Sequence, residues 1–174
     1  MNSAVGARAI ERWATCEGSG SLYTGQVLPL QPYGIRGATW YQGEWDSRSA
    51  GDAGKYYWQL PCLIDECRND WGQSPFPFYV VQMPKMGLKS IHIVRDAELQ
   101  TALSDPQVEM IVTIDQPGHD VHPPCKDPFG QRLANLALEL EYGVDLMARS
   151  PLPNAAASYV GEGTINVVFG HVAE

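Results

Sequence analysis

The sequence has no cluster of lysine and arginine residues and no long hydrophobic run. Twelve basic residues are spread among twenty acidic ones, which gives the 174-residue chain a net charge of -8. Phosphates and anionic lipids are bound by surfaces of the opposite charge, so we expect no nucleic-acid or membrane partner. No stretch approaches the roughly 18 apolar residues of a membrane span. The first twenty residues also lack the basic-then-apolar order of a secretory signal.

Two signatures of reactive sites are missing as well. The four cysteines form no CxxC pair, which gives little support to a zinc or thioredoxin-like site. No GxSxG motif occurs, and Ser74 precedes a Pro-Phe-Pro segment, as a turn residue would. The residues alone therefore reveal no nucleophile, and they indicate no cofactor.

The apolar residues are arranged as alternating strands and helices. Short runs rich in β-branched and aromatic residues predict buried strands, and apolar residues spaced three or four apart predict helices. The expected strands are 35–41, 78–83 and 109–114, and the expected helices are 54–71, 94–103 and 129–141. Pro61 is expected to kink the first helix or to move its start. This order favours an α/β fold with a parallel sheet covered on both faces.

The two ends of the chain differ from this pattern. Residues 1–34 are expected to form loop, with a brief helical turn near 9–13. Beyond residue 150 the character changes, because a strand at 165–169 follows a glycine-rich turn and has no helix to pair with. We therefore expect one domain over residues 1–150 and the start of a C-terminal β segment over 151–174.

Two loops lie where active sites of parallel sheets are found, beyond the carboxyl ends of strands. They are 43–49 and 115–126, and the second contains His119, Asp120 and His122. A histidine beside a carboxylate suits a general base, and His122 is the better candidate. Two alternatives remain: a solvated loop without a catalytic role, and a metal site made of these three side chains. The metal site is disfavoured because three ligands within four residues rarely converge on one ion.

Three motifs resemble those of one enzyme family. Residues 33–44, YGIRGATWYQGE, are similar to the segment PYxIRGxxWYQGESN of the sialate O-acetylesterases, which are members of the SGNH (GDSL-like) hydrolase superfamily. WGQ at 71–73, FPFY at 76–79 and VQ at 81–82 are similar to the family's WGQGxFPFxxVQL. VTID at 112–115 and DVHP at 120–123 are similar to VTIDxGxxxDIHP. Residues 5–13 resemble a degraded VGGTxIEAW segment.

The resemblance implies a flavodoxin-like three-layer α/β/α fold, here incomplete. It also implies a carbohydrate esterase that hydrolyses O-acetyl esters on sialic acid or other sugars by a Ser-His-Asp mechanism. No residue matches the motif that carries the serine, so the chain is expected to be an internal part of a longer esterase. An open sheet edge would then favour self-association. Longer family members are frequently secreted or periplasmic.

The resemblance also implies roles for individual residues. His122 corresponds to the base, and Asp120 to the acid that orients it, although the superfamily often places that acid at the position of His119. Oxyanion-hole equivalents are Gly6 and Asp46. The substrate pocket candidates are Gln42, Glu44 and Trp45.

Asp46 departs from the family, which has asparagine at this position. An asparagine amide donates to the oxyanion, whereas an ionised aspartate only accepts and adds negative charge. Losing one such donor lowers turnover roughly a hundred- to a thousandfold. Trp45 replaces a small serine and would fill or block the pocket. The sequence thus leaves two hypotheses: an esterase whose serine lies in upstream sequence, and a catalytically dead remnant that serves as a sugar-binding or interaction module.

Overall fold

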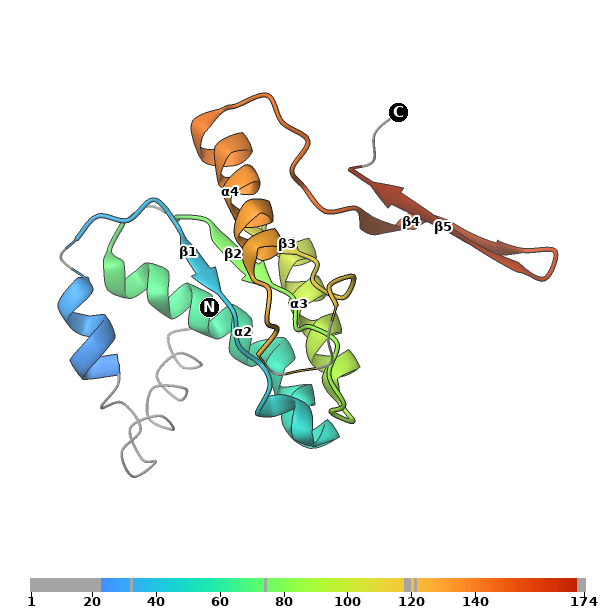
Figure 1. The fold of residues 1–174 in the computed structure, drawn as a ribbon, viewed down its shortest axis with the longest axis horizontal. Helices are drawn as coiled ribbons and strands as arrows, with labels where there is room; N and C mark the ends of the chain where they lie inside the picture. The colour runs from blue at the N-terminus through green and yellow to red at the C-terminus, as the bar shows by residue number, and fades with distance from the viewer. Residues whose placement is uncertain (1–22, 32, 74, 118–119, 121, 172–174) are drawn as a thin grey trace.

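The computed structural model describes residues 23–31, 33–73, 75–117, 120 and 122–171. Its centre is a parallel sheet of three strands in the order β1-β2-β3 (Figure 1). The strands are β1 (Ala38–Trp40), β2 (Phe78–Val81) and β3 (Val108–Ile111). Thr39 of β1 pairs with Tyr79 of β2, which pairs with Glu109 of β3. The three predicted strands and their parallel order are confirmed, although each is shorter than expected.

Helix α2 (Ala50–Trp71) follows β1 after the short 3-10 helix η3 (Asp46–Arg48). It begins earlier than residue 54, because the Ser49 hydroxyl caps its first turn by accepting from the Asp52 amide. It ends at Gly72, whose φ of 60° belongs to the left-handed conformation that terminates helices. The helix continues through Pro61, so the start is not moved to the proline.

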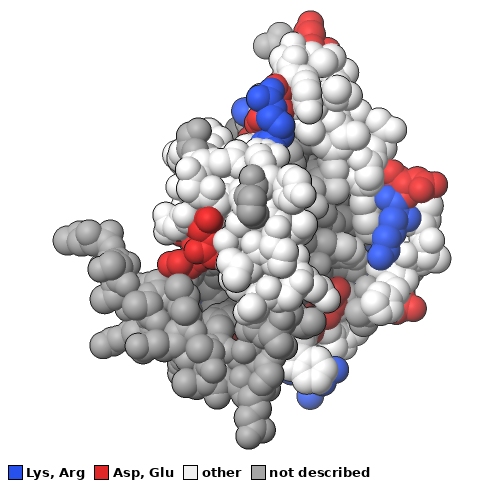
Figure 2. All heavy atoms as spheres, turned by 90° about the vertical axis from the view of Figure 1, so that its left-hand side faces the viewer, with Lys and Arg blue, Asp and Glu red and all other residues white. Residues whose placement is uncertain are grey.

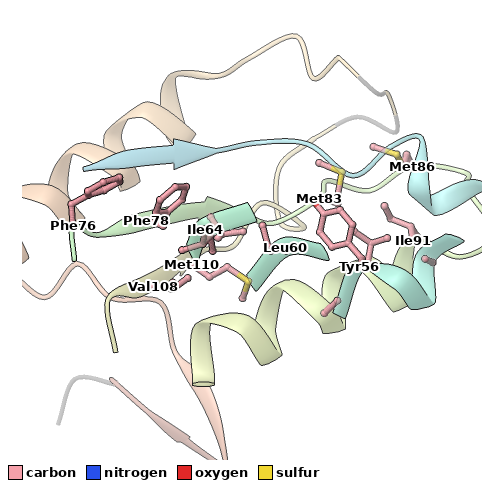
Figure 3. Packing of buried hydrophobic residues seen from close by; sticks show 14 residues of the cluster. Tyr56, Leu60, Ile64, Phe76, Phe78, Met83, Met86, Ile91, Val108 and Met110 are labelled. Atoms are coloured by element: carbon pink, nitrogen blue, oxygen red, sulfur yellow. The ribbon is translucent and has the colours of Figure 1, made fainter. Parts of the chain in front are cut away.

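The sheet lies between helices, as the pattern predicted (Figure 1). Helices α2 and α3 (Ile91–Ser104) cover one face, and α4 (Asp127–Tyr142) covers the other. Alternate residues of β2 divide between the two cores: Phe78 and Val80 face α2 and α3, whereas Tyr79 and Val81 face α4. Figure 3 shows the larger core, where Leu60 and Ile64 of α2 lie on the same side of the sheet as the ring of Phe78 in β2.

Two strands beyond α4 form a separate antiparallel hairpin. They are β4 (Leu152–Gly161) and β5 (Thr164–Gly170), and they join at Glu162 and Gly163, both with positive φ. The sequence predicted only the second strand. The first was missed because Pro153 and three alanines have low strand propensity, and here pairing with β5 decides the conformation.

The segment before β1 is partly helical rather than loop alone. It contains η1 (Tyr23–Val27) and η2 (Leu28–Leu30), while the expected helical turn near 9–13 lies outside the described residues. No helix in the described part of the chain is long and apolar enough to cross a membrane. On the face in Figure 2, lysine and arginine side chains lie at separate places and do not form one basic patch.

Candidate functional site

The turn after β1 is held by hydrogen bonds to its own backbone. The carbonyl of Gly43 accepts from both the amide and the hydroxyl of Ser47, at 3.0 and 2.7 Å. Gly43 has a φ of 151°, and an added Cβ would lie 2.8 Å from a methyl carbon of Val94, so only glycine fits. This close approach to α3 fixes the position of the whole turn.

A buried phenol fixes the start of the same turn. The Tyr56 hydroxyl of α2 donates to the carbonyl of Gln42 at 2.6 Å and accepts from the Trp40 indole at 2.8 Å. Burial raises the pKa of Tyr56 well above its usual range, so the hydroxyl keeps its proton. Gln42 is therefore held at its backbone, and its side chain is directed toward the rest of the turn.

The three side chains after Gly43 that the sequence singled out differ in exposure. Trp45 is 69% exposed, and the Arg48 guanidinium lies 3.5 Å from the centroid of its ring. Asp46 is half-buried and accepts from the Gln42 side-chain amide at 3.1 Å. Glu44, also half-buried, accepts from the Gly43 amide at 3.0 Å. The turn thus presents one indole and two carboxylates.

The loop after β3 is anchored to α4 by an ion pair. Arg132 donates to Asp115 at 2.9 Å and to the backbone carbonyl of Val112. The hydrogen bond from Arg132 lowers the pKa of the Asp115 carboxyl to about 2. Thr113 connects the same segment to the residue that follows β2, since its hydroxyl donates to the Gln82 carbonyl at 2.6 Å.

His122 and Asp120 lie in this loop, and both are exposed. Oδ1 of Asp120 accepts from the backbone amide of His122 at 3.1 Å, so the carboxylate shapes the loop. Among the described residues no hydrogen bond joins that carboxylate to the His122 ring. Gly6 and His119, the other candidates for oxyanion donor and acid, lie outside the described residues. Within the part of the chain that is described, no group of three potential ligands could hold a metal ion.

The two loops meet at Tyr41, the residue after β1. Lys126, at the end of the second loop, places its ammonium 5.7 Å from the centroid of the Tyr41 ring. Phe129, in the first turn of α4, meets the same ring edge-on at 6.2 Å. The chain that carries His122 therefore returns to the residue next to Gln42. Two loops on opposite sides of β2 are brought to one end of the sheet.

Residues that support the turn were missed at the sequence level. Met83 packs against Gly43, and Glu98 of α3 is fully buried and accepts from the Met83 amide. A signal for Glu98 was present, because it falls on the apolar stripe of its helix together with Val94 and Thr101. An acidic residue at such a position indicates a buried polar contact.

Comparisons with known proteins agree with these motifs. The family described as carbohydrate esterase, sialic acid-specific acetylesterase matches residues 1–139. A sialate O-acetylesterase of Mus musculus is 29% identical over an alignment 171 residues long, gaps included, and the match covers 85% of this chain and 31% of that protein. The crystal structure of a carbohydrate acetylesterase from Xanthomonas citri superposes with a TM-score of 0.72 at 30% identity, covering 81% of this chain and 34% of that one. The chain thus spans about a third of the length of these relatives. It belongs to the sialic acid-specific acetylesterase family of carbohydrate esterases.

Proposed function

We propose that this chain carries the base-bearing part of a site that hydrolyses O-acetyl esters on sialic acid or other sugars. The observation that supports the proposal is the contact of Lys126 and Phe129 with Tyr41. This contact supports the proposal because it joins the end of the loop that carries His122 to Tyr41, the residue before Gln42, at the edge of the sheet where active sites of parallel sheets are found.

In this proposal His122 acts as general base. It takes the proton of a serine hydroxyl while the serine oxygen attacks the carbonyl carbon of the acetyl group, and it gives that proton to the sugar oxygen as the ester C–O bond breaks. A water molecule, deprotonated by the same histidine, then attacks the acetyl-serine ester and releases acetate and the free serine. Asp120 sets the position of His122 through its bond to the backbone amide. Gln42, Glu44 and Trp45 would line the sugar side of the site, and Gly6 would supply an oxyanion donor.

Asp46 weakens this site. In water-poor surroundings an ionised carboxylate repels the oxyanion that forms during acyl transfer. The Gln42 amide bonded to Asp46 is already engaged, so it offers little compensation. Because no serine matches the nucleophile motif either, we propose negligible esterase activity for the 174-residue chain. The alternative is a catalytically dead remnant that binds sugars or another protein.

Hydrolysis of p-nitrophenyl acetate tests this proposal. We expect the purified chain, its His122→Ala variant and its His92→Ala variant to match the buffer rate. His92 is exposed on α3 and serves as the matched control. Turnover well above buffer that disappears in His122→Ala and survives in His92→Ala would overturn the proposed inactivity and identify the base. Binding of sialic acid without turnover, measured by calorimetry, would favour the remnant.

We also propose that residues 1–150 act as the esterase part and 151–174 begin a β segment. The β1 edge of the sheet would favour self-association, because β1 has no strand on its outer side among the described residues. Beside that edge lies a hollow of about 290 Å³ between β1 and α4, with Arg36, Tyr79 and Tyr142 in its lining. Sedimentation velocity at several concentrations tests this: a constant monomeric value would contradict self-association.

A further inference from the structure

Glu98 lies in the core beneath the turn after β1. Its side chain is 0% exposed, and Oε2 accepts from the backbone amide of Met83 at 3.1 Å. The second oxygen, Oε1, has no hydrogen-bond partner within the described part of the chain. A buried carboxyl group with one oxygen unpaired costs free energy. Hydrophobic packing of α3 alone does not require it.

The Met83 that Glu98 holds is in contact with the turn. An added Cβ at Gly43 would lie 3.2 Å from Cγ and 3.3 Å from Sδ of Met83. Figure 3 shows Met83 and Ile91 at one end of the larger core, close to Tyr56. The Met83 backbone is fixed on its other side by Arg95, whose Nε donates to the Met83 carbonyl at 2.8 Å. Glu98 and Arg95, one turn apart on α3, thus form hydrogen bonds with both the backbone amide and the backbone carbonyl of Met83.

Helix α3 reaches the same turn by a second route. The Ser90 amide, just before the helix, donates to the Ser47 carbonyl at 3.1 Å. Ser47 in turn donates twice to Gly43. The start of α3 therefore holds the far end of the turn, and Glu98 holds its near end through Met83. Asp46 lies between these two points.

The charged and titratable groups around Glu98 come from four elements. They are Arg95 on α3, Glu44 on the turn, Tyr41 after β1 and Tyr56 on α2. Burial raises the pKa of Glu98 to about 8, while the Met83 amide and Arg95 lower it and Glu44 raises it further. The carboxyl group is therefore largely protonated at neutral pH. Its ionisation would place a negative charge under the turn.

We propose that Glu98 is a positioning residue that holds the turn from Gly43 to Ser47 in place by bracing Met83. The relevance of Glu98 to catalysis rests on the function proposed above. The coupling between Glu98 and the turn, which runs through Met83, does not depend on that function. The coupling predicts that proton loss from Glu98 is transmitted to amides of the turn. It also predicts that an uncharged acceptor at position 98 preserves the turn.

Amide resonances of Gly43, Ser47 and Met83, followed by NMR from pH 5 to 9.5, test the proposal without any esterase assay. In the unchanged chain we expect all three to shift together with a midpoint near pH 8. In Glu98→Gln that titration is lost while the spectrum at pH 6 is kept. Asp65→Asn, an exposed acid on α2, is the control and should leave the titration unchanged.

Hydrogen exchange supplies a second readout. Glu98→Leu removes the acceptor of the Met83 amide, and we expect about tenfold faster exchange at Met83 and Ser47, as loss of one buried hydrogen bond implies. Glu98→Gln should stay close to the unchanged chain. The absence of a shared titration at Gly43, Ser47 and Met83, or a titration that persists in Glu98→Gln, would overturn the proposal. These NMR outcomes decide the proposal even if Glu98→Leu fails to fold. Absence of esterase activity does not contradict it.

Discussion

The side-chain amide of Gln42 donates a hydrogen bond of 3.1 Å to Oδ2 of Asp46. The bond closes the turn after β1, since the Gln42 backbone is itself held by the Tyr56 hydroxyl. In the family motif an asparagine amide would occupy the position of Asp46 and donate to a ligand. Here the donor belongs to Gln42 and is directed at Asp46. The turn thus has a carboxylate at the position where the function proposed above would use a hydrogen-bond donor.

This relationship predicts the effect of Asp46→Asn on anion binding. Removing the carboxylate eliminates a repulsion of about 1 kcal/mol between unit charges a few ångströms apart in water. We therefore expect acetate, the product of deacetylation, to bind near the turn roughly fivefold more tightly in Asp46→Asn, as this energy implies. Acetate titrations followed at the amides of Gly43 and Ser47 measure it. Asp65→Asn removes the same charge elsewhere, and equal affinities in Asp46→Asn and the unchanged chain would refute the prediction.

Gly43 and Gly54 form a matched pair for stability. Gly43→Ala places a methyl group 2.8 Å from Val94 at a φ of 151°, so we expect a loss of about 2–4 kcal/mol from overpacking and backbone strain. Gly54→Ala adds a methyl group inside α2 with no atom within 4 Å. It should stabilise the protein by about 0.5–1 kcal/mol through helix propensity. Urea unfolding of both variants measures the two effects, and equal midpoints would contradict the described packing of Gly43.

The sequence predicted the layers of the fold because periodicity reports burial directly. Phe78 and Val80 alternate with Tyr79 and Val81, and a run that is apolar at every position is expected of a strand buried on both faces. Strand ends were less predictable. Tyrosine favours strands, but Tyr41 lies beyond Trp40, where β1 ends. Its ring instead packs against Phe129 and the Lys126 ammonium. Such long-range contacts leave no local trace.

Candidate site residues could be proposed from the sequence where they follow a motif, and their roles stay predictions. The contacts that support the turn could not be predicted, because they depend on the three-dimensional structure. His122 was proposed from its place after a strand, and Asp46 from its place in the motif that residues 33–44 resemble. The support of Gly43 by Met83 and Glu98 could not, because these residues lie forty or more positions away. The bond from Asp120 to the His122 backbone was also unforeseen, since a carboxylate two residues before a histidine can serve either its ring or its amide.

Arg68 is predicted to be a structural anchor. Its guanidinium lies 2.6 Å from Asp105 and donates to the backbone carbonyls of Phe76 and Gln107, which precede β2 and β3. The side chain is only 11% exposed, and truncation removes three of its hydrogen bonds. The Phe76 carbonyl loses its donor, whereas the Gln107 carbonyl still accepts from the Phe78 amide and Asp105 still accepts from the Gln107 amide. We expect Arg68→Ala to lower the free energy of unfolding by about 2–4 kcal/mol.

The exposed pair of Lys55 and Asp52 on α2 provides the comparison for Arg68. Both side chains are about half exposed, at 49% and 51%. Exposed ion pairs of this kind contribute little because water screens them. Lys55→Ala should therefore leave the urea midpoint unchanged. If Lys55→Ala destabilised the chain as much as Arg68→Ala, burial would not be what distinguishes the two pairs.

The ion pair of Arg132 and Asp115, called the clamp below, should make the free energy of unfolding depend on pH in the acidic range. The hydrogen bond to Arg132 lowers the pKa of Asp115 from 3.8 to about 2 in the folded state. Between these values the unfolded chain binds more protons, so stability is fully present above about pH 4 and is lost as pH falls toward 2. Because Asp115 is 52% exposed, water screens the pair, and we expect the contribution to be about 1 kcal/mol or less.

Urea unfolding at pH 5, 3.5 and 2.5 measures this dependence. In Asp115→Asn the partner charge is absent at every pH, so its midpoint should fall less between pH 5 and 2.5 than that of the unchanged chain. Arg132→Gln should show the same flattening, because the pKa shift requires both partners. Asp65→Asn, which lies outside the clamp, should keep the original slope.

Since Asp115 begins the loop that carries His122, loss of the clamp should also increase hydrogen exchange at the His122 amide relative to that of Met83, which lies outside this loop. A uniform increase at both amides would instead indicate global destabilisation and would contradict a local role for the pair.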